Sequence, residues 1–364
     1  MKSPNGNIDV VTGKNGADEH IFSVIIKRTY RINHGQPLER SEEDAELRKT
    51  DAYYDNGDPE WSVVQYEYEL APHKQSVDVV VVGKAYAGVE KTAQTMTVGA
   101  RIGKRKKLVR VFGDRQCNYQ GNTDPEFTDP QPFTEMDIRY DRAYGGHDEK
   151  SDPSQPFYYP RNTHGCGVVM QNVKESIDGL MLPNFEDPDQ LLCPENLVIG
   201  DPKRWPEMPL PQGLGWYQRN WYPRCALMGA FPAYVDVGYA TPEEVKGLLP
   251  KNHIALAMQY KLPSFVSRFN NGASLDMTFQ ELASNEKIEL RGLNPSGTLD
   301  FSLPGETPKA SLDIGKGSTQ LDVKLDTVCI RPDDLQVDML WRATLVYEGY
   351  SWFPNMTRLH AEVS

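Results

Sequence analysis

The sequence predicts a mainly β protein, with antiparallel β-sandwich or meander sheets, a loop-rich centre and few short helices. Runs of alternating apolar and polar residues recur at a spacing of about ten residues, as in sandwiches and meanders. The 364 residues include 29 glycines and 27 prolines, which favours many short elements joined by tight turns. The 18 tyrosines and 6 tryptophans supply bulky side chains for a folded core.

The first strand patterns lie in the N-terminal quarter. Residues 22–32 (FSVIIKRTYRI) begin apolar and then alternate, as expected of a strand with one buried face, and residues 61–70 alternate again. Residues 77–86 (VDVVVVGKAY) give the strongest strand prediction, because consecutive valines are stiff at χ1 and pack well on a pleated sheet. Residues 40–49 (RSEEDAELRK) are charged, and we expect a short exposed helix or a mobile excursion there.

A hairpin follows, and then the sequence changes character. Residues 92–102 and 106–112 flank Gly103, which favours a β-hairpin with the glycine in its turn. From about residue 119 to residue 216, proline and glycine recur every few residues, so long regular elements are not expected. We expect a compact, loop-rich region held together by aromatic side chains, since so much ring area would not stay in water.

Strand patterns return in the C-terminal part of the chain. Residues 241–244 (TPEE) carry the signals of a helix start, namely a capping threonine, a proline in the first turn and an acid three residues after the cap. Strand-like runs follow from Ser274 onward. The turn signal at residues 294–297 (NPSG) makes residues 287–303 a predicted hairpin.

The length of the chain fits two or three domains, or a single large β domain. The patterns suggest an N-terminal β-rich region, residues 1–240, which contains the loop-rich centre, and a C-terminal β-rich region, residues 241–364. The second region is expected to pack on the first, or to continue it as one domain.

Composition and charge argue against several classes of partner. A net charge of −12 and a pI near 5.2 would repel a phosphate backbone, so we expect no nucleic acid partner. No run approaches the ~20 apolar residues that span a bilayer, so no membrane partner is expected. The first residues contain no apolar signal segment, and the five scattered cysteines fit reduced thiols. The expected location is therefore the cytoplasm.

Two motifs have both a structural and a functional interpretation. Residues 113–115 (GDR) follow a strand as a phosphate loop would, but the further glycines and the Lys-Ser/Thr ending are missing. A turn in which Arg115 pairs with a carboxylate is favoured. Residues 140–147 (YDRAYGGH) form either a partner-facing loop or a loop pinned by a buried Arg–Asp pair, because the two glycines allow positive φ and Arg142 can bind a carboxylate bidentately.

No reactive constellation stands out. His164 and Cys166 lie two residues apart, but a nucleophilic cysteine needs an orienting third group and a zinc site needs two more ligands. Glu186 and its acidic neighbours lie among prolines, which fits turn chemistry better than acid–base catalysis. No GxSxG, HExxH or Walker-type motif occurs, so we expect neither an enzyme nor a cofactor. The basic run from Arg101 to Arg110 either holds an acidic client segment or guards an edge strand.

Separated fingerprints run through the whole chain. They are LAPHK at 70–74 with Asp78, VFGDR at 111–115, YDRAYGG at 140–146, LPNFEDP at 182–188, WYPR at 221–224, RFNNGA at 268–273, LPG at 303–305, DTV at 326–328 and WR at 341–342. In their order and spacing they resemble a bacterial family long catalogued as a domain of unknown function and now tied to type VI secretion. Members of that family hold a toxic effector for loading onto the secretion spike.

This resemblance implies an effector-specific chaperone or adaptor in the cytoplasm. Its partners would be the cognate secreted effector and a PAAR-type tip or spike protein. On a β-rich scaffold, we expect the client to bind at aromatic loops and at an open sheet edge. Two other classes stay open: a carbohydrate-binding β-sandwich that stacks sugars on exposed rings, and a hydrolase with a dispersed site.

The candidate residues fall into two groups. Those expected to contact a partner are Arg115, Tyr140, Arg142, Tyr144, Tyr158, Tyr159, Trp216 and Trp221. Those expected to build the motifs are Asp78, Gly113, Asp114, Gly145, Gly146, Pro183, Asn184, Glu186, Trp341 and Arg342. The resemblance carries no agreed catalytic residues, so none is assigned.

Overall fold

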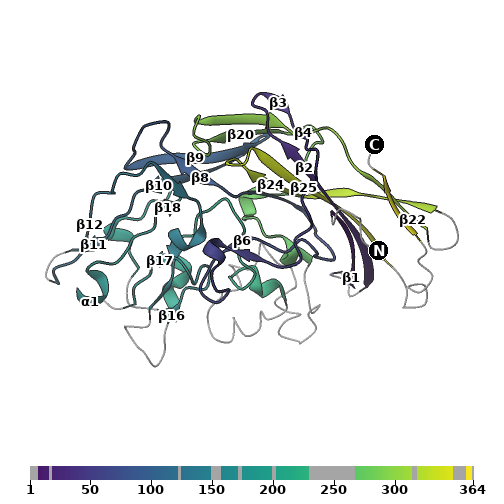
Figure 1. The fold of residues 1–364 in the computed structure, drawn as a ribbon. Coiled ribbons are helices and arrows are strands. Elements are labelled where there is room, and N and C mark those ends of the chain that lie inside the picture. Colours follow the sequence, from purple (N-terminus) through teal and green to yellow (C-terminus); the bar gives the residue numbers. More distant parts are fainter. Residues whose placement is uncertain are drawn as a thin grey trace.

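The fold is mainly β, which confirms the class predicted from the sequence (Figure 1). The computed structural model describes residues 7–15, 19–121, 124–148, 157–170, 174–198, 202–228, 267–313, 318–346 and 358–362. Among these residues the longest helix is η4 (Pro202–Glu207), with six residues. The helix expected from Thr241 lies outside the described residues.

A seven-stranded sheet forms one layer. Its strands in spatial order are β1 (Ile8–Lys14), β2 (His20–Arg31), β25 (Gln336–Val346), β24 (Lys324–Arg331), β7 (Val77–Val81) and β19 (Thr278–Phe279), with β4 (Glu39–Arg40) beside β2. The long strands β2 and β25 pair antiparallel, whereas β24 and β7 pair parallel. A parallel pair is feasible here because a long connection, rather than a tight turn, separates these two strands in the sequence.

A six-stranded sheet forms the second layer. Its spatial order is β18 (Phe185–Glu186), β10 (Arg105–Phe112), β9 (Thr95–Ile102), β20 (Lys287–Arg291), β21 (Thr298–Ser302) and β3 (Gln36–Pro37). Both predicted hairpins, β9–β10 and β20–β21, are confirmed, and Gly103 has the positive φ of +54° that its turn requires. Both large sheets contain strands from before and after residue 240.

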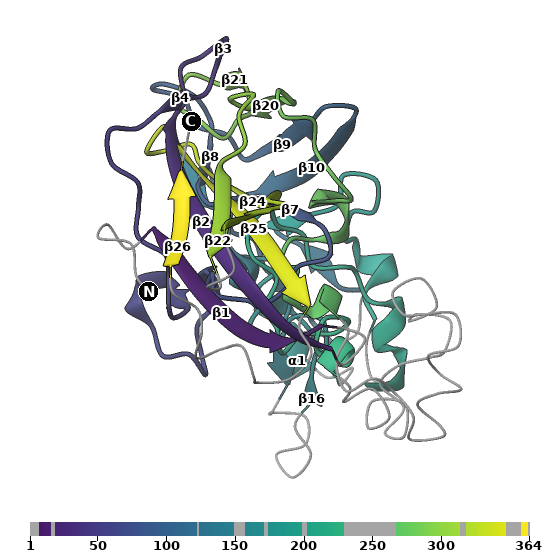
Figure 2. The same ribbon diagram turned by 90° about the vertical axis from the view of Figure 1, so that its right-hand side faces the viewer.

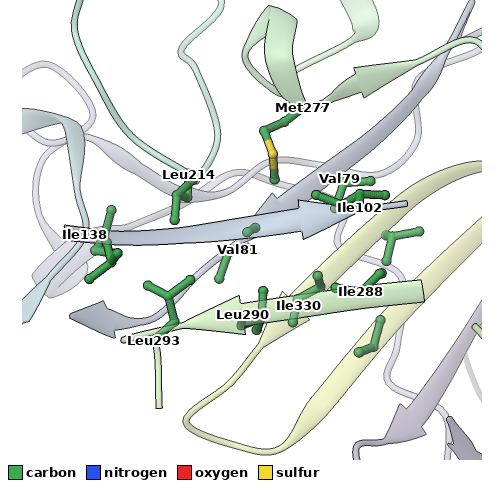
Figure 3. Packing of buried hydrophobic residues seen from close by; sticks show 14 of the residues in the cluster. Val79, Val81, Ile102, Ile138, Leu214, Met277, Ile288, Leu290, Leu293 and Ile330 are labelled. Atoms are coloured by element: carbon green, nitrogen blue, oxygen red, sulfur yellow. The ribbon is translucent and has the colours of Figure 1, made fainter. Parts of the chain in front are cut away.

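The main core lies between the two large sheets (Figure 3). Val79 and Val81 of β7 and Ile330 of β24 pack with Ile288 and Leu290 of β20. These five side chains are no more than 1% exposed. Because side chains alternate along a strand, the other face of the seven-stranded sheet carries the intervening residues, and several of them are charged.

Shorter elements complete the molecule. The small sheets consist of β5 (Ala52–Tyr53) with β6 (Val64–Tyr66), β8 (Lys84–Tyr86) with β13 (Glu135–Asp137), β11 (Cys117–Asn118) with β12 (Glu126–Phe127), β14 (Tyr144–Gly145) with β17 (Cys166–Gly167), β15 (His147–Asp148) with β16 (Phe157–Tyr158), and β22 (Lys309–Asp313) between β23 (Ser318–Leu321) and β26 (Arg358–Glu362). The other helices are η1 (Tyr54–Asn56), η2 (Tyr140–Arg142), α1 (Lys174–Ile177), η3 (Pro194–Asn196), η5 (Cys225–Met228), η6 (Ser267–Asn270) and η7 (Leu275–Met277). Figure 2 shows β22 and β26 in front of β1 and β2, where Ala310 and Leu321 pack on Phe22 and Val24.

The segment 40–49 departs from expectation. It forms no exposed helix: after β4 it is irregular and lies against β2, with Leu47 buried. Asp44 accepts hydrogen bonds from the Arg28 guanidinium at 2.8 Å and from the Thr29 backbone N–H at 3.0 Å. Asp44, one of the charges that suggested a solvated helix, therefore attaches the segment to the sheet.

Candidate functional site

Aromatic side chains hold the loop-rich centre together. Seven rings form what we call the aromatic cluster: Tyr140, Tyr144, Tyr159, Trp205, Tyr217, Trp221 and Tyr222. Neighbouring ring centroids lie 5.2–6.4 Å apart with planes at 70–87°, the edge-to-face geometry that aromatic rings prefer. The Tyr217 hydroxyl donates to the Tyr222 carbonyl at 2.7 Å and joins the two halves of the cluster.

Most residues expected to contact a partner lie inside the protein. Those that are no more than 7% exposed are Arg115, Tyr140, Tyr144, Tyr159, Trp216 and Trp221. Tyr158 is 41% exposed and stacks on His147 with 5.4 Å between ring centroids, and the Arg142 side chain is 41% exposed. The buried rings therefore position the loops, and of the expected set only Tyr158 and Arg142 face solvent.

Arg115 makes the internal ion pair that its motif predicts. Its guanidinium bonds the Glu186 carboxylate and lies over the Phe112 ring, 3.9 Å from the centroid. Glu186 also accepts the Leu192 backbone N–H at 2.7 Å. Burial is the main influence on both ionisable groups: it raises the pKa of Glu186 and lowers the pKa of Arg115, against their mutual attraction. The pair ties the turn after β10 to β18.

The glycine-rich loop is pinned, but the pin differs from the one expected. A Cβ on Gly145 would lie 2.2 Å from the Asn162 carbonyl oxygen, and one on Gly146 would lie 2.6 Å from the Gly165 carbonyl oxygen. Buried Asn162 donates to the Tyr140 carbonyl at 2.6 Å. Arg142 pairs with Asp114 at 3.6 Å at the surface, so a buried Arg–Asp pair, which was one of the two interpretations of this motif, is wrong for Arg142. The loop is held instead by the close packing of its two glycines against the backbone of Asn162 and Gly165.

His164 and Cys166 do not form a reactive pair. The His164 Nε2 atom lies 3.0 Å from the Glu60 carbonyl oxygen, and the Cys166 thiol lies 3.9 Å from the Ala143 carbonyl oxygen. Burial raises the pKa of Cys166 to about 12, which leaves the thiol protonated and a poor nucleophile. Within the described residues, no group of three or more His, Cys, Asp and Glu side chains could hold a metal ion.

A line of buried ion pairs, the charged spine, crosses the face of the seven-stranded sheet that turns away from the main core. Lys27 of β2 is fully buried and bonds Glu69 at 2.8 Å, with Asp338 of β25 at 3.6 Å. Arg48 bridges the same two carboxylates at 2.7 and 3.5 Å. Asp338 also accepts the Thr29 hydroxyl at 2.8 Å. Each charge at this end of the spine has an oppositely charged partner.

The spine continues through the fingerprint residues. Arg342 bonds Asp326 at 2.6 Å, and the hydroxyl of Thr327 donates to the same carboxylate at 2.8 Å. Lys74 donates to Thr327 at 2.8 Å and to Asp78 at 2.7 Å. Asp78 is fully buried and also accepts two hydrogen bonds from the RFNNGA motif. Fingerprints that lie far apart in the sequence thus meet in one network.

Beside Lys74 and Arg342 the surface is hollowed into a groove of about 560 Å³. Its lining comes from within residues 73–77, 280–284, 303–307, 322–326 and 339–344. Buried Trp341 and Leu303 give it an apolar floor. Exposed charged residues of both signs also line it, including Glu281, Asp322 and Lys324.

His73 lies in the groove next to the spine. Burial lowers the pKa of its imidazole from the ordinary 6.5, and the nearby Arg342 lowers it further. The ring is therefore neutral at physiological pH and offers one donor and one acceptor. Opposite charges, an imidazole and an apolar floor suit a polypeptide, which brings backbone hydrogen-bonding groups and mixed side chains.

One strand has an unpaired side in this groove. β24 pairs with β25 from Lys324 onward, with a register shift at Asp326, but with β7 only from Thr327 to Ile330. Among the described residues no strand lies along the other side of residues 324–326, and all three of these residues line the groove. A short stretch of sheet edge therefore opens into it.

The family described as an uncharacterized protein conserved in bacteria (DUF2169) matches residues 17–342. The chain belongs to this family. No curated protein and no solved structure matches the chain. The region shared with DUF2169 contains the aromatic cluster, the charged spine and all of the groove lining except Thr344. In the part of the chain that the structure describes, no helix is long and apolar enough to cross a membrane.

Sequence reasoning located the fingerprint residues of this DUF2169 chain but missed the groove. Asp78 and Arg342 belong to the spine, Trp341 to the groove floor, and Asn184 bonds Asp114 at 3.0 Å. Gly113 packs against the Gln131 backbone, and the Pro183 carbonyl lies 3.5 Å from Arg115.

The charged groove residues Glu281, Glu306, Asp322 and Lys324 were not singled out. Their positions beside the fingerprints at 303–305 and 326–328 were the available signal.

Proposed function

We propose that this chain is an effector-specific chaperone or adaptor that holds a type VI secretion effector in the cytoplasm without converting it chemically. The fingerprints described above support this class of client. In this proposal the client binds in the groove and is delivered to the spike or its PAAR-type tip. Burial of the aromatic cluster gives no support to the carbohydrate-binding alternative, which needs exposed rings.

The unpaired side of residues 324–326 carries the proposal. An extended client segment added there would pair with β24 through backbone hydrogen bonds, which do not depend on the client sequence. Side-chain selectivity would come from the groove wall, where Lys324 and Asp322 form an exposed pair at 3.2 Å and Glu281 is also exposed. Such rim charges influence partner choice and association rate more than affinity.

Co-expression with the effector encoded beside this protein, followed by pulldown, tests the proposal. We expect a complex with the unchanged chain, and an effector that is less soluble without it. The double variant Glu281→Lys, Lys324→Glu reverses exposed groove charges and is expected to weaken capture. Lys91→Glu, an exposed lysine before β9 and outside the groove, is the control and should capture normally.

Hydrogen exchange on the complex tests the mode of binding. Strand addition should slow amide exchange in residues 324–326, because new backbone hydrogen bonds protect the amides. A complex with unchanged exchange there would contradict strand addition. Failure to form any complex, with equal effector solubility in both cultures, would overturn the adaptor function itself.

A further inference from the structure

A second cavity, which we call the leucine pocket, shares no lining residue with the groove. It lies where η2, η6 and η7 meet residues 210–217, and its volume is about 190 Å³. A cavity of about 150 Å³ is large enough to hold a benzene ring, so this pocket has room for one bulky side chain.

Apolar groups dominate the pocket. Leu210 is 56% exposed and Leu275 is 53% exposed, and both line it. Tyr140 and Tyr217 add aromatic rings from the aromatic cluster. Exposed leucines that line the same cavity indicate a binding surface that a ligand or partner covers, because single exposed leucines on a protein surface are normally scattered.

Two buried polar atoms at the pocket have no partner within the described residues. They are the Tyr140 hydroxyl and the Asn271 Oδ1 atom, and the two residues are only 4% and 6% exposed. Buried polar groups in native proteins are almost always hydrogen-bonded, so orphaned atoms beside a cavity indicate a polar ligand group or water in it.

The charges at the pocket are mostly positive. Lys107, Arg161, Arg224 and Arg268 line it, and Asp276 is the one carboxylate in the lining. Arg224 is already paired with buried Glu67, so the excess comes from the other three cations. Asp276 pairs with Lys107 at 3.2 Å and is itself 64% exposed, so solvent weakens its neutralising effect. Arg268 has no ion-pair partner among the described residues. On a protein of net charge −12, such a local excess of cations favours an anion.

We propose that the leucine pocket binds the last residue of a polypeptide client, with its apolar side chain between Leu210 and Leu275 and its free carboxylate at Arg268. This assignment rests on the proposed adaptor function, because it names the part of the client that is held. The carboxylate supplies the ion-pair partner that Arg268 lacks among the described residues, and a guanidinium binds a carboxylate in a bidentate, charge-assisted geometry. The Tyr140 hydroxyl is a second donor at the same cavity.

Acetyl-leucine and its uncharged amide are the probes, titrated into the full chain and followed by ligand-observed NMR. Acetyl-leucine should bind saturably, and the amide should bind about tenfold more weakly because it lacks the charge-assisted bond. Arg268→Gln should abolish this difference, and Leu275→Asp should weaken both probes. Arg291→Gln, a 66% exposed arginine outside the pocket, is the matched control and should behave like the unchanged chain.

Equal affinity for acid and amide, or binding unaffected by Arg268→Gln, would overturn the inference. So would a dimer that forms through this face and is not dissociated by acetyl-leucine, because a second copy would then be the occupant. If acetyl-leucine fails to bind while the effector is still captured, only the pocket assignment falls. If acetyl-leucine binds as expected but no effector is captured, the adaptor function falls, and the pocket remains a site for a free leucine carboxylate without that client.

Discussion

The charged spine and the aromatic cluster hold irregular chain against the β scaffold by opposite physical means. In the spine, Lys27, Glu69 and Asp338 are buried and each is neutralised by an opposite charge. In the aromatic cluster, rings pack edge to face, while the hydroxyls of Tyr140 and Tyr144 have no hydrogen-bond partner among the described residues. In the spine these charges are paired, whereas in the aromatic cluster the rings pack closely but some polar groups stay unpaired.

This difference determines how each region responds to substitution. Removal of one member of a buried ion pair leaves its partner as an uncompensated charge in a medium of low dielectric, which is strongly destabilising. Removal of an unbonded hydroxyl loses no hydrogen bond and relieves a buried polar group of its desolvation cost. The same kind of polar deletion should therefore damage one region and leave the other unharmed.

The largest effect is expected at Asp78. Asp78→Ala leaves the buried Lys74 ammonium without its carboxylate, and the free energy of unfolding should fall by about 3–5 kcal/mol. Asp322→Ala is the control, because the Asp322–Lys324 pair is 82% and 77% exposed and should matter by no more than about 0.5 kcal/mol. Urea denaturation measures both. Equal losses would show that the spine is no more than a set of surface pairs.

Acid should weaken the spine through Asp338. Burial alone would raise the pKa of this carboxyl, but Lys27, Arg331 and the Thr29 hydroxyl outweigh burial and lower it from the ordinary 3.8. A lowered carboxyl pKa stabilises the fold above the unfolded pKa, and this stability disappears as the pH falls through the folded value. Asp338→Asn should cost about 1.5–3 kcal/mol near neutral pH, because a hydrogen-bonded charge is lost.

Denaturation between about pH 3 and pH 7 measures this contribution. The unchanged chain should lose more stability below the ordinary aspartate pKa than the Asp338→Asn variant does. Identical acid slopes in the two proteins would mean that other carboxylates carry the acid sensitivity.

Backbone approach in the loop-rich centre gives the next effect. Gly146→Ala places a Cβ 2.6 Å from the Gly165 carbonyl oxygen at a φ of +107°, so it should cost about 1–3 kcal/mol. Gly297→Ala has a similar φ of +95° but open space around the new Cβ, and should cost only about 1 kcal/mol. Thermal unfolding of both variants separates steric contact from backbone strain. A larger loss at Gly297 would contradict the pinned loop.

Local patterns predicted the strands, whereas the candidate site depends on distant segments. The β9–β10 and β20–β21 hairpins follow from alternation and a turn signal within about 20 residues. The number of aromatic residues predicted the aromatic cluster but not which rings are buried. Tyr144 and Tyr158 are both tyrosines of the loop-rich centre, yet the first is buried and the second is exposed. The groove escaped prediction because its walls come from five segments, and the end of the β7–β24 pairing is set by tertiary structure.

The smallest effect distinguishes two tyrosines of the aromatic cluster. The Tyr159 hydroxyl donates to the Pro209 carbonyl at 2.9 Å, so Tyr159→Phe should cost about 0.5–1.5 kcal/mol. The Tyr144 hydroxyl is buried without a partner among the described residues, and burial raises its pKa well above 10. Tyr144→Phe keeps the ring contact with Tyr159 and should change stability by less than about 0.5 kcal/mol, or increase it. Calorimetry measures the stability of both variants, and because each keeps its ring, the comparison isolates the effect of the hydroxyl. A loss at Tyr144 equal to the loss at Tyr159 would reveal a bonded hydroxyl there, and that polar group would then be paired as the charges of the spine are.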